Sequence, residues 1–241
     1  MKEVVLKNKI RACIKQNKNT PRVALTLNLS IAQPEKYAGQ YSLMNRLLLK
    51  GTKKYNSEEL SSILDENAIE FYTEMKSDYL RFRFICLNED FELALSIMSD
   101  IIKNSTFEEF EKEREKMKGE LVAELDSARV KISDLFTKTI YKDHYYGHSY
   151  TKILEEIDNV KKEDVISAYN EILTKSTKTL ALVGEADDSI LEKYLGDIAP
   201  SIENTSSIEP PATIKQECVE LIQNDANQAQ ILQGWFVPTI G

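Results

Sequence analysis

Apolar and polar residues alternate through the first part of the chain, which predicts strands. The longest such run covers residues 22–31 and places Val23, Leu25, Leu27 and Leu29 on one face, as in a strand with one buried side. Shorter runs of the same kind occupy residues 3–6 and 10–15. We expect the three segments to lie side by side in one sheet.

Two further alternating runs are rich in aromatic residues. They cover residues 69–75 and 78–87 and are separated by little more than Lys76 and Ser77. Aromatic residues favour strands, and so short a connection is typical of a β-hairpin. Within the second run, Cys86 shares a face with Leu80, Phe82 and Phe84, which predicts that it is buried as a small hydrophobic residue.

Apolar residues three or four positions apart predict the helices. Asn56 with Glu59 resembles a capping box at the start of one helix. Phe91, Ala94, Leu95, Met98, Ile101 and Ile102 keep helical spacing without a miss. Further helices are expected at residues 151–157, 161–174 and 187–196, with a buried-type strand at residues 177–187.

Residues 107–141 contain no glycine or proline except Gly119. Their apolar spacing fits one long helix or two helices broken near Gly119 or Ser127. The charge run EEFEKEREK at the start of this segment mixes signs at neighbouring-turn distances. It predicts a solvated helical face with weak ion pairs.

The composition and periodicity of the sequence change after residue 198. Residues 199–213 are rich in Ser, Pro and Thr and have no periodicity, which is typical of a linker. Residues 218–223 and 228–238 resemble two strands, and Trp235 and Phe236 fit the core of a further unit. We therefore expect a domain at 1–198, a linker at 199–213, and the start of a second, truncated domain at 214–241.

The predicted order of strands and helices indicates an α+β fold, a two-layer sandwich with one mostly antiparallel sheet and helices on one face.

Composition limits the function classes. The 31 Lys and Arg residues against 39 Asp and Glu give a net charge of −8, which opposes nucleic-acid binding. No apolar run approaches the roughly 20 residues that span a bilayer, and residues 1–15 lack the apolar segment of a signal peptide. We expect a soluble protein whose compartment the sequence does not indicate.

The three cysteines, Cys13, Cys86 and Cys218, are odd in number and far apart, which argues against a disulfide framework or a Cys-x-x-Cys site.

Residues 39–52, GQYSLMNRLLLKGT, have the frame of a metallopeptidase active-site helix. A His-x-x-Glu-His helix binds zinc because its two histidines lie one turn apart on one face, while the glutamate serves as general base. In this helix the same face offers Ser42, Asn45 and Arg46. Neutral Ser and Asn are poor zinc ligands, and the guanidinium of Arg46 places a fixed positive charge at the metal position.

Residues 38–64 resemble a segment of the insulinase and pitrilysin zinc peptidases, relatives of the mitochondrial processing peptidase. In that family an inverted His-x-x-Glu-His motif precedes a Lys-Gly-Thr turn, here Lys50-Gly51-Thr52. EREKMKGELVAELD at 113–126 resembles the family's distal segment, and HYYGHSY, NVKKEDVISAYNEIL and LALVGEAD follow in the family's order. The resemblance spans roughly residues 3–240.

The resemblance implies which residues would form the site. The three family positions fall on Ser42, Asn45 and Arg46, all replaced, and the third zinc ligand falls on Glu120, with Glu113 as its helical neighbour. Zinc is the metal of active relatives, but a lone carboxylate does not hold it, so we expect no cofactor. His144 and His148 could bind a metal if they lay on a helix, although Gly147 and the surrounding tyrosines favour an irregular turn with aromatic packing.

We interpret the chain as a degenerate, non-catalytic domain of this family that binds or encloses unfolded peptide and partners a catalytic domain or subunit of the same family. By resemblance, the peptide adds as a strand near residues 69–75, with Phe71, Tyr72 and Thr73 as contact candidates; for Phe71, packing in the core is the better interpretation. Whether the chain is an enzyme stays open. One alternative is an active peptidase with displaced ligands, for which the candidates are His144, His148 and Glu120. Another is a scaffold that only dimerises, including as a homodimer.

Overall fold

The structure, a computed structural model, describes residues 1–203, 208–212, 219 and 229–237. Its six strands form one sheet in the order β1-β2-β6-β3-β5-β4. The first three strands share this sheet, but the prediction that they lie side by side is wrong for the second and third, because β6 pairs between them. Every neighbouring pair is antiparallel except β2 and β6, which run parallel. The strands are β1 (Lys2–Val5), β2 (Arg11–Gln16), β3 (Arg22–Ser30), β4 (Glu70–Met75), β5 (Tyr79–Leu87) and β6 (Lys178–Gly184).

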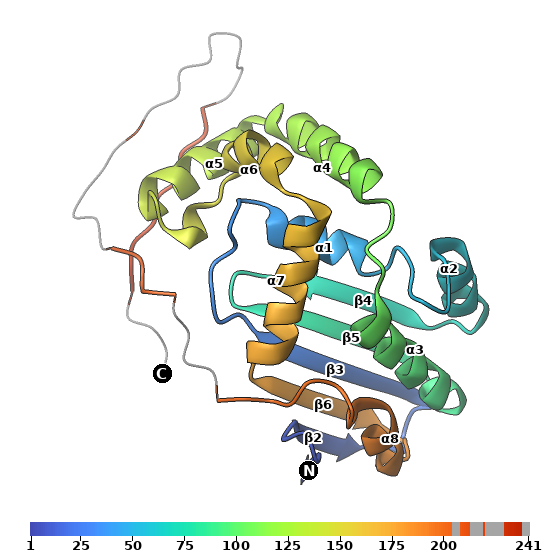
Figure 1. Cartoon of the computed structure of the whole chain (residues 1–241). Helices are drawn as coiled ribbons and strands as arrows, with labels where there is room; N and C mark the ends of the chain where they lie inside the picture. Colours follow the sequence, from blue (N-terminus) through green and yellow to red (C-terminus); the bar gives the residue numbers. More distant parts are fainter. Residues whose placement is uncertain (204–207, 213–218, 220–228, 238–241) are drawn as a thin grey trace.

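The helices gather on one face of this sheet (Figure 1), so the predicted α+β two-layer sandwich is confirmed. They are α1 (Gln40–Leu47), α2 (Ser57–Glu66), α3 (Phe91–Asn104), α4 (Phe110–Leu125), α5 (Ala128–Tyr141), α6 (Tyr150–Glu156), α7 (Lys162–Lys175) and α8 (Leu191–Leu195). Short 3₁₀ turns occupy η1 (Asn88–Asp90), η2 (Tyr145–Gly147), η3 (Ile157–Asn159) and η4 (Asp188–Ile190). No helix within the described ranges is long and apolar enough to cross a membrane.

The core lies between the two layers because one face of each central strand is apolar. Val23, Leu25, Leu27 and Leu29 of β3 are all fully buried, and opposite them on β5 lie buried Leu80, Phe82, Phe84 and Cys86. The alternation predicted for β3 and β5 is thus confirmed, as are the hairpin between β4 and β5 and the capping box of α2.

The segment 107–141 forms two helices, and the break falls at Ser127, which precedes α5. Gly119 lies inside α4, where a Cβ would meet no atom within 4 Å. The glycine therefore costs some helix propensity without ending the helix. The predicted helix at 187–196 is shorter, because its first turn is the 3₁₀ turn η4 and α8 spans only Leu191–Leu195.

Residues after α8 return across the start of β6. The backbone N–H of Ser201 donates to the Asn8 carbonyl at 2.8 Å, and that of Ile202 donates to the Ser176 carbonyl at 3.2 Å. The first part of the expected linker is therefore hydrogen-bonded to the main domain. Residues 229–237 contain no strand, and Phe236 packs against Tyr141 with ring centroids 6.1 Å apart. Most of residues 214–228, where the second domain was expected to begin, lies outside the described residues.

Candidate functional site

The helix α1 is fixed at its N-terminus by two carboxylates from other parts of the chain. The backbone N–H groups of Gly39 and Tyr41 donate to Glu35, at 3.1 and 2.7 Å. Glu156 at the end of α6 accepts the Ala38 N–H at 2.7 Å. Acidic groups stabilise this end of a helix because its N–H groups lack partners and carry partial positive charge. The position of α1 over the sheet is therefore set from both α6 and the preceding loop.

One face of α1 is buried and the other carries the three predicted site positions. Leu43, Met44, Leu47 and Leu48 are fully buried, as the helical pattern predicts. Ser42 is exposed, while Asn45 and Arg46 are partly exposed. The helix α1 contacts both the helix α4 and the strand β4, and Arg46 contacts Glu120 of α4 while Asn45 contacts Thr73 of β4.

Two ion pairs join α1 and its extension to α4. The Arg46 guanidinium binds the Glu120 carboxylate through Nη2 and Oε2. One turn further along, Lys50 Nζ lies 2.9 Å from Glu113 Oε1. This second contact has the distance of an ion pair without the angle of a hydrogen bond, so Glu113 Oε1 has no hydrogen-bond partner among the described residues. Glu113 is only 3% exposed, and Lys50 supplies the charge that offsets its burial.

The pair with Arg46 changes the pKa of the Glu120 carboxylate. Hydrogen bonding to the Arg46 guanidinium lowers the pKa of Glu120 below its ordinary value, because that bond favours the charged form. Glu120 is accordingly an anion at neutral pH, and its negative charge is already compensated by a fixed cation.

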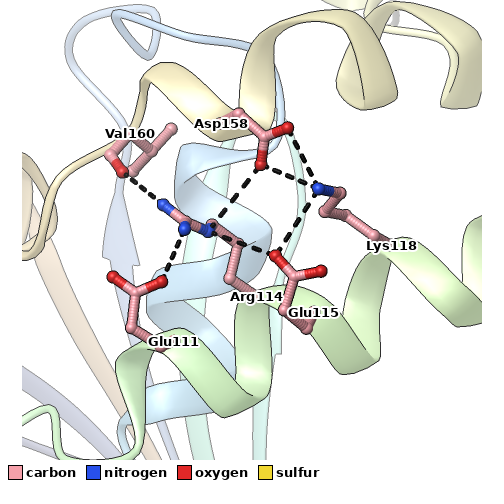
Figure 2. A network of polar contacts seen from close by, with 6 residues as sticks. All are labelled: Glu111, Arg114, Glu115, Lys118, Asp158 and Val160. Atoms are coloured by element: carbon pink, nitrogen blue, oxygen red, sulfur yellow. Dashed lines mark hydrogen bonds and ion pairs between the residues drawn. The ribbon is translucent and has the colours of Figure 1, made fainter.

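A polar network holds α4 against the turn that follows α6. Figure 2 shows Arg114 reaching from α4 to the Val160 carbonyl and toward Asp158, while Lys118 Nζ contacts Asp158 at 2.9 Å. Arg114 also pairs with Glu111 and Glu115 on its own helix. The predicted solvated face of this charge run is only partly correct. Glu113 and Arg114 are largely buried, Glu113 beside Lys50 and Arg114 against the Val160 carbonyl.

The strand β4 forms the edge of the sheet next to α1. Lys76 N–H donates to the Tyr79 carbonyl, and residues 70–75 continue that antiparallel register. Hydrogen-bonded and non-hydrogen-bonded residues alternate along such a pair. Glu70, Tyr72 and Glu74 therefore direct their backbone groups toward β5, and Phe71, Thr73 and Met75 direct theirs toward the free edge.

The three peptide-contact candidates consequently differ. Phe71 packs against the core with its side chain, as the sequence favours, while its backbone faces the edge. Tyr72 is 50% exposed on the opposite side, where its hydroxyl donates to Glu70 at 3.0 Å. Thr73 has an edge-facing carbonyl, which the Asn45 side chain contacts through Nδ2 at 3.5 Å.

A groove of about 560 Å³ opens between α2 and the first half of β4. Its lining is apolar at Leu49, Leu60, Leu64, Ile69 and Phe71, with Lys50, Asp65 and Glu70 among its polar groups. Because the groove runs beside the free edge, a strand paired with β4 would direct alternate side chains into it.

Comparison with known proteins identifies the family. A family model described as insulinase, peptidase family M16, matches residues 11–158. The chain belongs to the insulinase family of peptidases, M16. The resemblance of residues 38–64 to these peptidases is thereby confirmed.

The chain is similar to longer M16 proteins. It is 24% identical to the mitochondrial-processing peptidase subunit alpha-1 of Dictyostelium discoideum, over 84% of this chain and 32% of that protein. It is 21% identical to an uncharacterised zinc protease of Streptomyces coelicolor, over 81% of this chain and 45% of that protein. The chain thus spans a third to a half of the length of these relatives.

Two solved structures have the same fold. A protease from Helicobacter pylori superposes with a TM-score of 0.74 at 16% identity, covering 88% of this chain and 53% of that one. An M16 peptidase inactive domain from Pseudomonas fluorescens superposes with a TM-score of 0.71 at 17% identity and with the same coverage. At this level of identity the likeness shows the fold alone.

Several relatives are named as zinc proteases. The side chains at the predicted site positions of this chain do not fit a zinc ion. Catalytic zinc requires three protein ligands, whereas Ser42 and Asn45 are neutral oxygen donors and Arg46 is a cation. The guanidinium of Arg46 lies against Glu120, the residue on which the sequence resemblance predicts the third ligand. We therefore derive no metal chemistry from this site.

The two histidines also lie in a different setting from a helical metal pair. His144 precedes the 3₁₀ turn η2, and its Nδ1 accepts the Tyr146 N–H at 3.1 Å. His148 follows the turn, and its Nδ1 lies 2.7 Å from Glu35 Oε1. The irregular turn with aromatic packing is confirmed by edge contacts of both rings with tyrosines. Among the described residues no three His, Cys, Asp or Glu side chains are placed to share a metal ion, so His144, His148 and Glu120 are not brought together.

Sequence patterns did not identify Lys50 or Glu35 as parts of the site. Lys50 belongs to the Lys-Gly-Thr turn, and only its position one turn beyond Arg46 signals that both cations face α4. Glu35 lies in a loop and meets its partner His148 113 positions later, so no local pattern contains the pair.

Proposed function

We propose that this chain is a non-catalytic M16 domain that binds extended polypeptide along the free edge of β4. The observation that supports the proposal is the Arg46–Glu120 ion pair, because the sequence resemblance aligns Arg46 with a zinc-binding histidine and Glu120 with the third ligand. Removing both histidines and the general base eliminates the groups that activate water, while the edge strand and its groove are retained.

The edge supports peptide binding through strand addition. In that mode main-chain hydrogen bonds give affinity, and pockets for alternate side chains give selectivity. The backbone groups of Phe71, Thr73 and Met75 are directed at the edge, and the groove at the first half of β4 is lined in part by apolar side chains, including Phe71. An extended peptide with an apolar residue facing the groove meets both requirements.

The second half of the proposal concerns a partner. Mitochondrial-processing peptidase is named as having subunits, and one structural neighbour is described as an inactive M16 domain. We propose that this chain likewise accompanies a catalytic domain or subunit of the same family, with the bound peptide enclosed between the two.

A substitution at the edge tests peptide binding. Thr73→Pro removes an edge-facing N–H while leaving the ladder to β5 intact, since Thr73 directs its backbone groups away from β5. We expect this variant to bind a labelled extended peptide at least about tenfold more weakly than the native chain. Thr73→Val keeps the N–H and a similar shape, and serves as the matched control. If the native chain has no measurable affinity for unfolded polypeptide, the proposal is wrong. The remaining alternative is then a scaffold that only dimerises, and sedimentation of the purified chain would detect the dimer.

Metal analysis tests the non-catalytic part. We expect no stoichiometric zinc and no cleavage of unfolded polypeptide that a chelator abolishes. One zinc per chain together with chelator-sensitive cleavage would establish the alternative, an active peptidase with displaced ligands.

A further inference from the structure

Asn45 occupies the position at which the peptidase motif carries its glutamate, and its carboxamide has one weakly bonded atom and one unbonded atom. Its Nδ2 donates to the Thr73 carbonyl at 3.5 Å, the long limit for a hydrogen bond. Its Oδ1 is buried and has no hydrogen-bond partner in the part of the chain that the structure describes. The side chain is thus held at the edge of β4 without being satisfied there.

The orientation of the carboxamide follows from its surroundings. Turning it over would place Oδ1 against the Thr73 carbonyl oxygen, where two acceptors repel, so Nδ2 is the atom that faces the strand. A buried acceptor without a partner is costly, at about 1–3 kcal/mol, and native proteins contain few of them. Among the described residues Oδ1 has no donor, so a donor from a bound molecule would satisfy it.

The edge of β4 indicates which donor this is. A strand added beside β4 presents N–H and C=O groups to Thr73, since Thr73 directs its own backbone groups outward. The peptide N–H that pairs with the Thr73 carbonyl replaces the long bond from Asn45. The released carboxamide then lies beside a peptide unit that offers one donor and one acceptor.

We propose that Asn45 is a positioning residue for bound polypeptide, in which Oδ1 accepts an N–H and Nδ2 donates to a C=O of the added strand. The inference rests on the proposed strand addition and identifies the group that fixes the register of the ligand. A carboxamide suits this role because it both donates and accepts, whereas the glutamate of the peptidase motif, when ionised, only accepts. The substitution that removes the general base therefore also supplies a peptide-binding group.

The probe for the test is a fluorescein-labelled decapeptide of alternating valine and threonine with lysine at both ends, and its dissociation constant is measured by anisotropy. Asn45→Ala removes both hydrogen bonds, so we expect about tenfold weaker binding. Asn45→Asp keeps the shape and the acceptors but removes the donor, so its affinity should also fall below that of the native chain. Asn45→Leu, which suits a partly buried helical position, replaces Asn45→Ala if the alanine variant does not fold.

Peptides with a single N-methylated amide supply a readout that a purely structural role would not move. In the native chain, methylation at the position whose N–H bonds Oδ1 should weaken binding. In Asn45→Ala the same methylation should have no further effect, and methylations elsewhere should cost the same in both proteins. Such coupling between one side chain and one peptide amide identifies the hydrogen bond.

The outcomes separate this inference from the proposed function. If the native chain does not bind the decapeptide, the proposed strand addition is itself wrong. Native binding with unchanged or tighter binding by Asn45→Ala overturns only the role of Asn45; tighter binding would show that its contact with Thr73 blocks the edge. Equal N-methylation penalties at every position in both proteins would likewise overturn it.

Discussion

Arg46 and Lys50 lie one turn apart and face two acids that are themselves two turns apart on α4. Arg46 and Glu120 are both partly exposed, at 32% and 42% of their side chains, and exposed pairs contribute little because solvent screens them. Lys50 and Glu113 differ, since Glu113 is only 3% exposed. The first pair therefore defines the chemistry of the site, and the second matters for stability.

We predict that Lys50→Met destabilises the fold by about 3 kcal/mol, because it leaves the Glu113 carboxylate buried without a counter-charge. The double variant Lys50→Met with Glu113→Met should recover most of that loss, since two apolar side chains can replace a buried pair. Urea unfolding measures both free energies. Lys112→Met, at an exposed pair on the same helix, is the control and should change little. A double variant no more stable than the single one would show that Glu113 has a role beyond its pairing with Lys50.

Lys178 is a buried lysine that makes no ion pair with a carboxylate in the described ranges of the chain. Its side chain is fully buried at the start of β6, and Nζ donates to the Pro200 carbonyl at 2.9 Å. Burial lowers the pKa of Lys178 from 10.5 to about 8. Between these two pH values the unfolded chain binds more protons than the folded chain, so this group makes stability rise as the pH rises.

We predict that Lys178→Met is more stable than the native chain at pH 7 and that the difference shrinks by about 2–3 kcal/mol between pH 8 and pH 10. The comparison between the two proteins cancels the contributions of the titrating groups that they share. Unfolding free energies at a series of pH values measure it. A difference that stays constant with pH would mean that Lys178 is charged to the same degree in both states.

At the scale of elements, the sequence predicted the strands, the hairpin and the helical frame of α1 from local periodicity. It also placed Ser42, Asn45 and Arg46 on one helical face. It did not predict the contact between Arg46 and Glu120 as an ion pair, because that contact depends on how α1 and α4 pack. The anchoring of α1 by Glu35 and Glu156 was missed for the same reason, since each carboxylate comes from outside the helix. Local patterns predict elements, whereas these contacts arise from tertiary packing.

We predict that Ser42→His, Asn45→Glu and Arg46→His, made together, allow the chain to bind zinc. The two imidazoles lie one turn apart on α1, and Arg46→His releases Glu120 to act as the third ligand. Metal analysis of the purified protein measures uptake. Adding Glu120→Ala should abolish it, whereas adding Glu111→Ala, at an exposed acid on the same helix, should not.

Two results would contradict the alignment of α1 with α4. Zinc uptake that survives Glu120→Ala would mean that another group provides the third ligand. A folded triple variant that takes up no zinc would mean that the groups which orient the ligands, typically worth 10 to 100-fold in affinity, are absent from this chain.

At the scale of the whole molecule, the chain spans only part of the length of its M16 relatives, and the structure shows how far the hydrogen-bonded domain extends along it. The sequence places the end at residue 198 from the change in composition. The structure extends the hydrogen-bonded domain to Ile202, whose carbonyl accepts from Thr177 Oγ1 at 2.7 Å. Residues 208–212 also reach the domain, where the Glu209 carbonyl lies 2.6 Å from His144 Nε2.

We predict that a chain ending at Glu203 is more stable than one ending at Ile198 by about 1–3 kcal/mol, because the shorter chain loses the partners of Asn8, Ser176 and Lys178. Urea unfolding of the two chains measures the difference. The shorter chain also uncovers Lys178, so its Nζ becomes hydrated and the pH-dependent gain from Lys178→Met should disappear in it. Equal stability, together with an unchanged pH dependence, would instead place the end of the domain at residue 198, where the loss of sequence periodicity puts it.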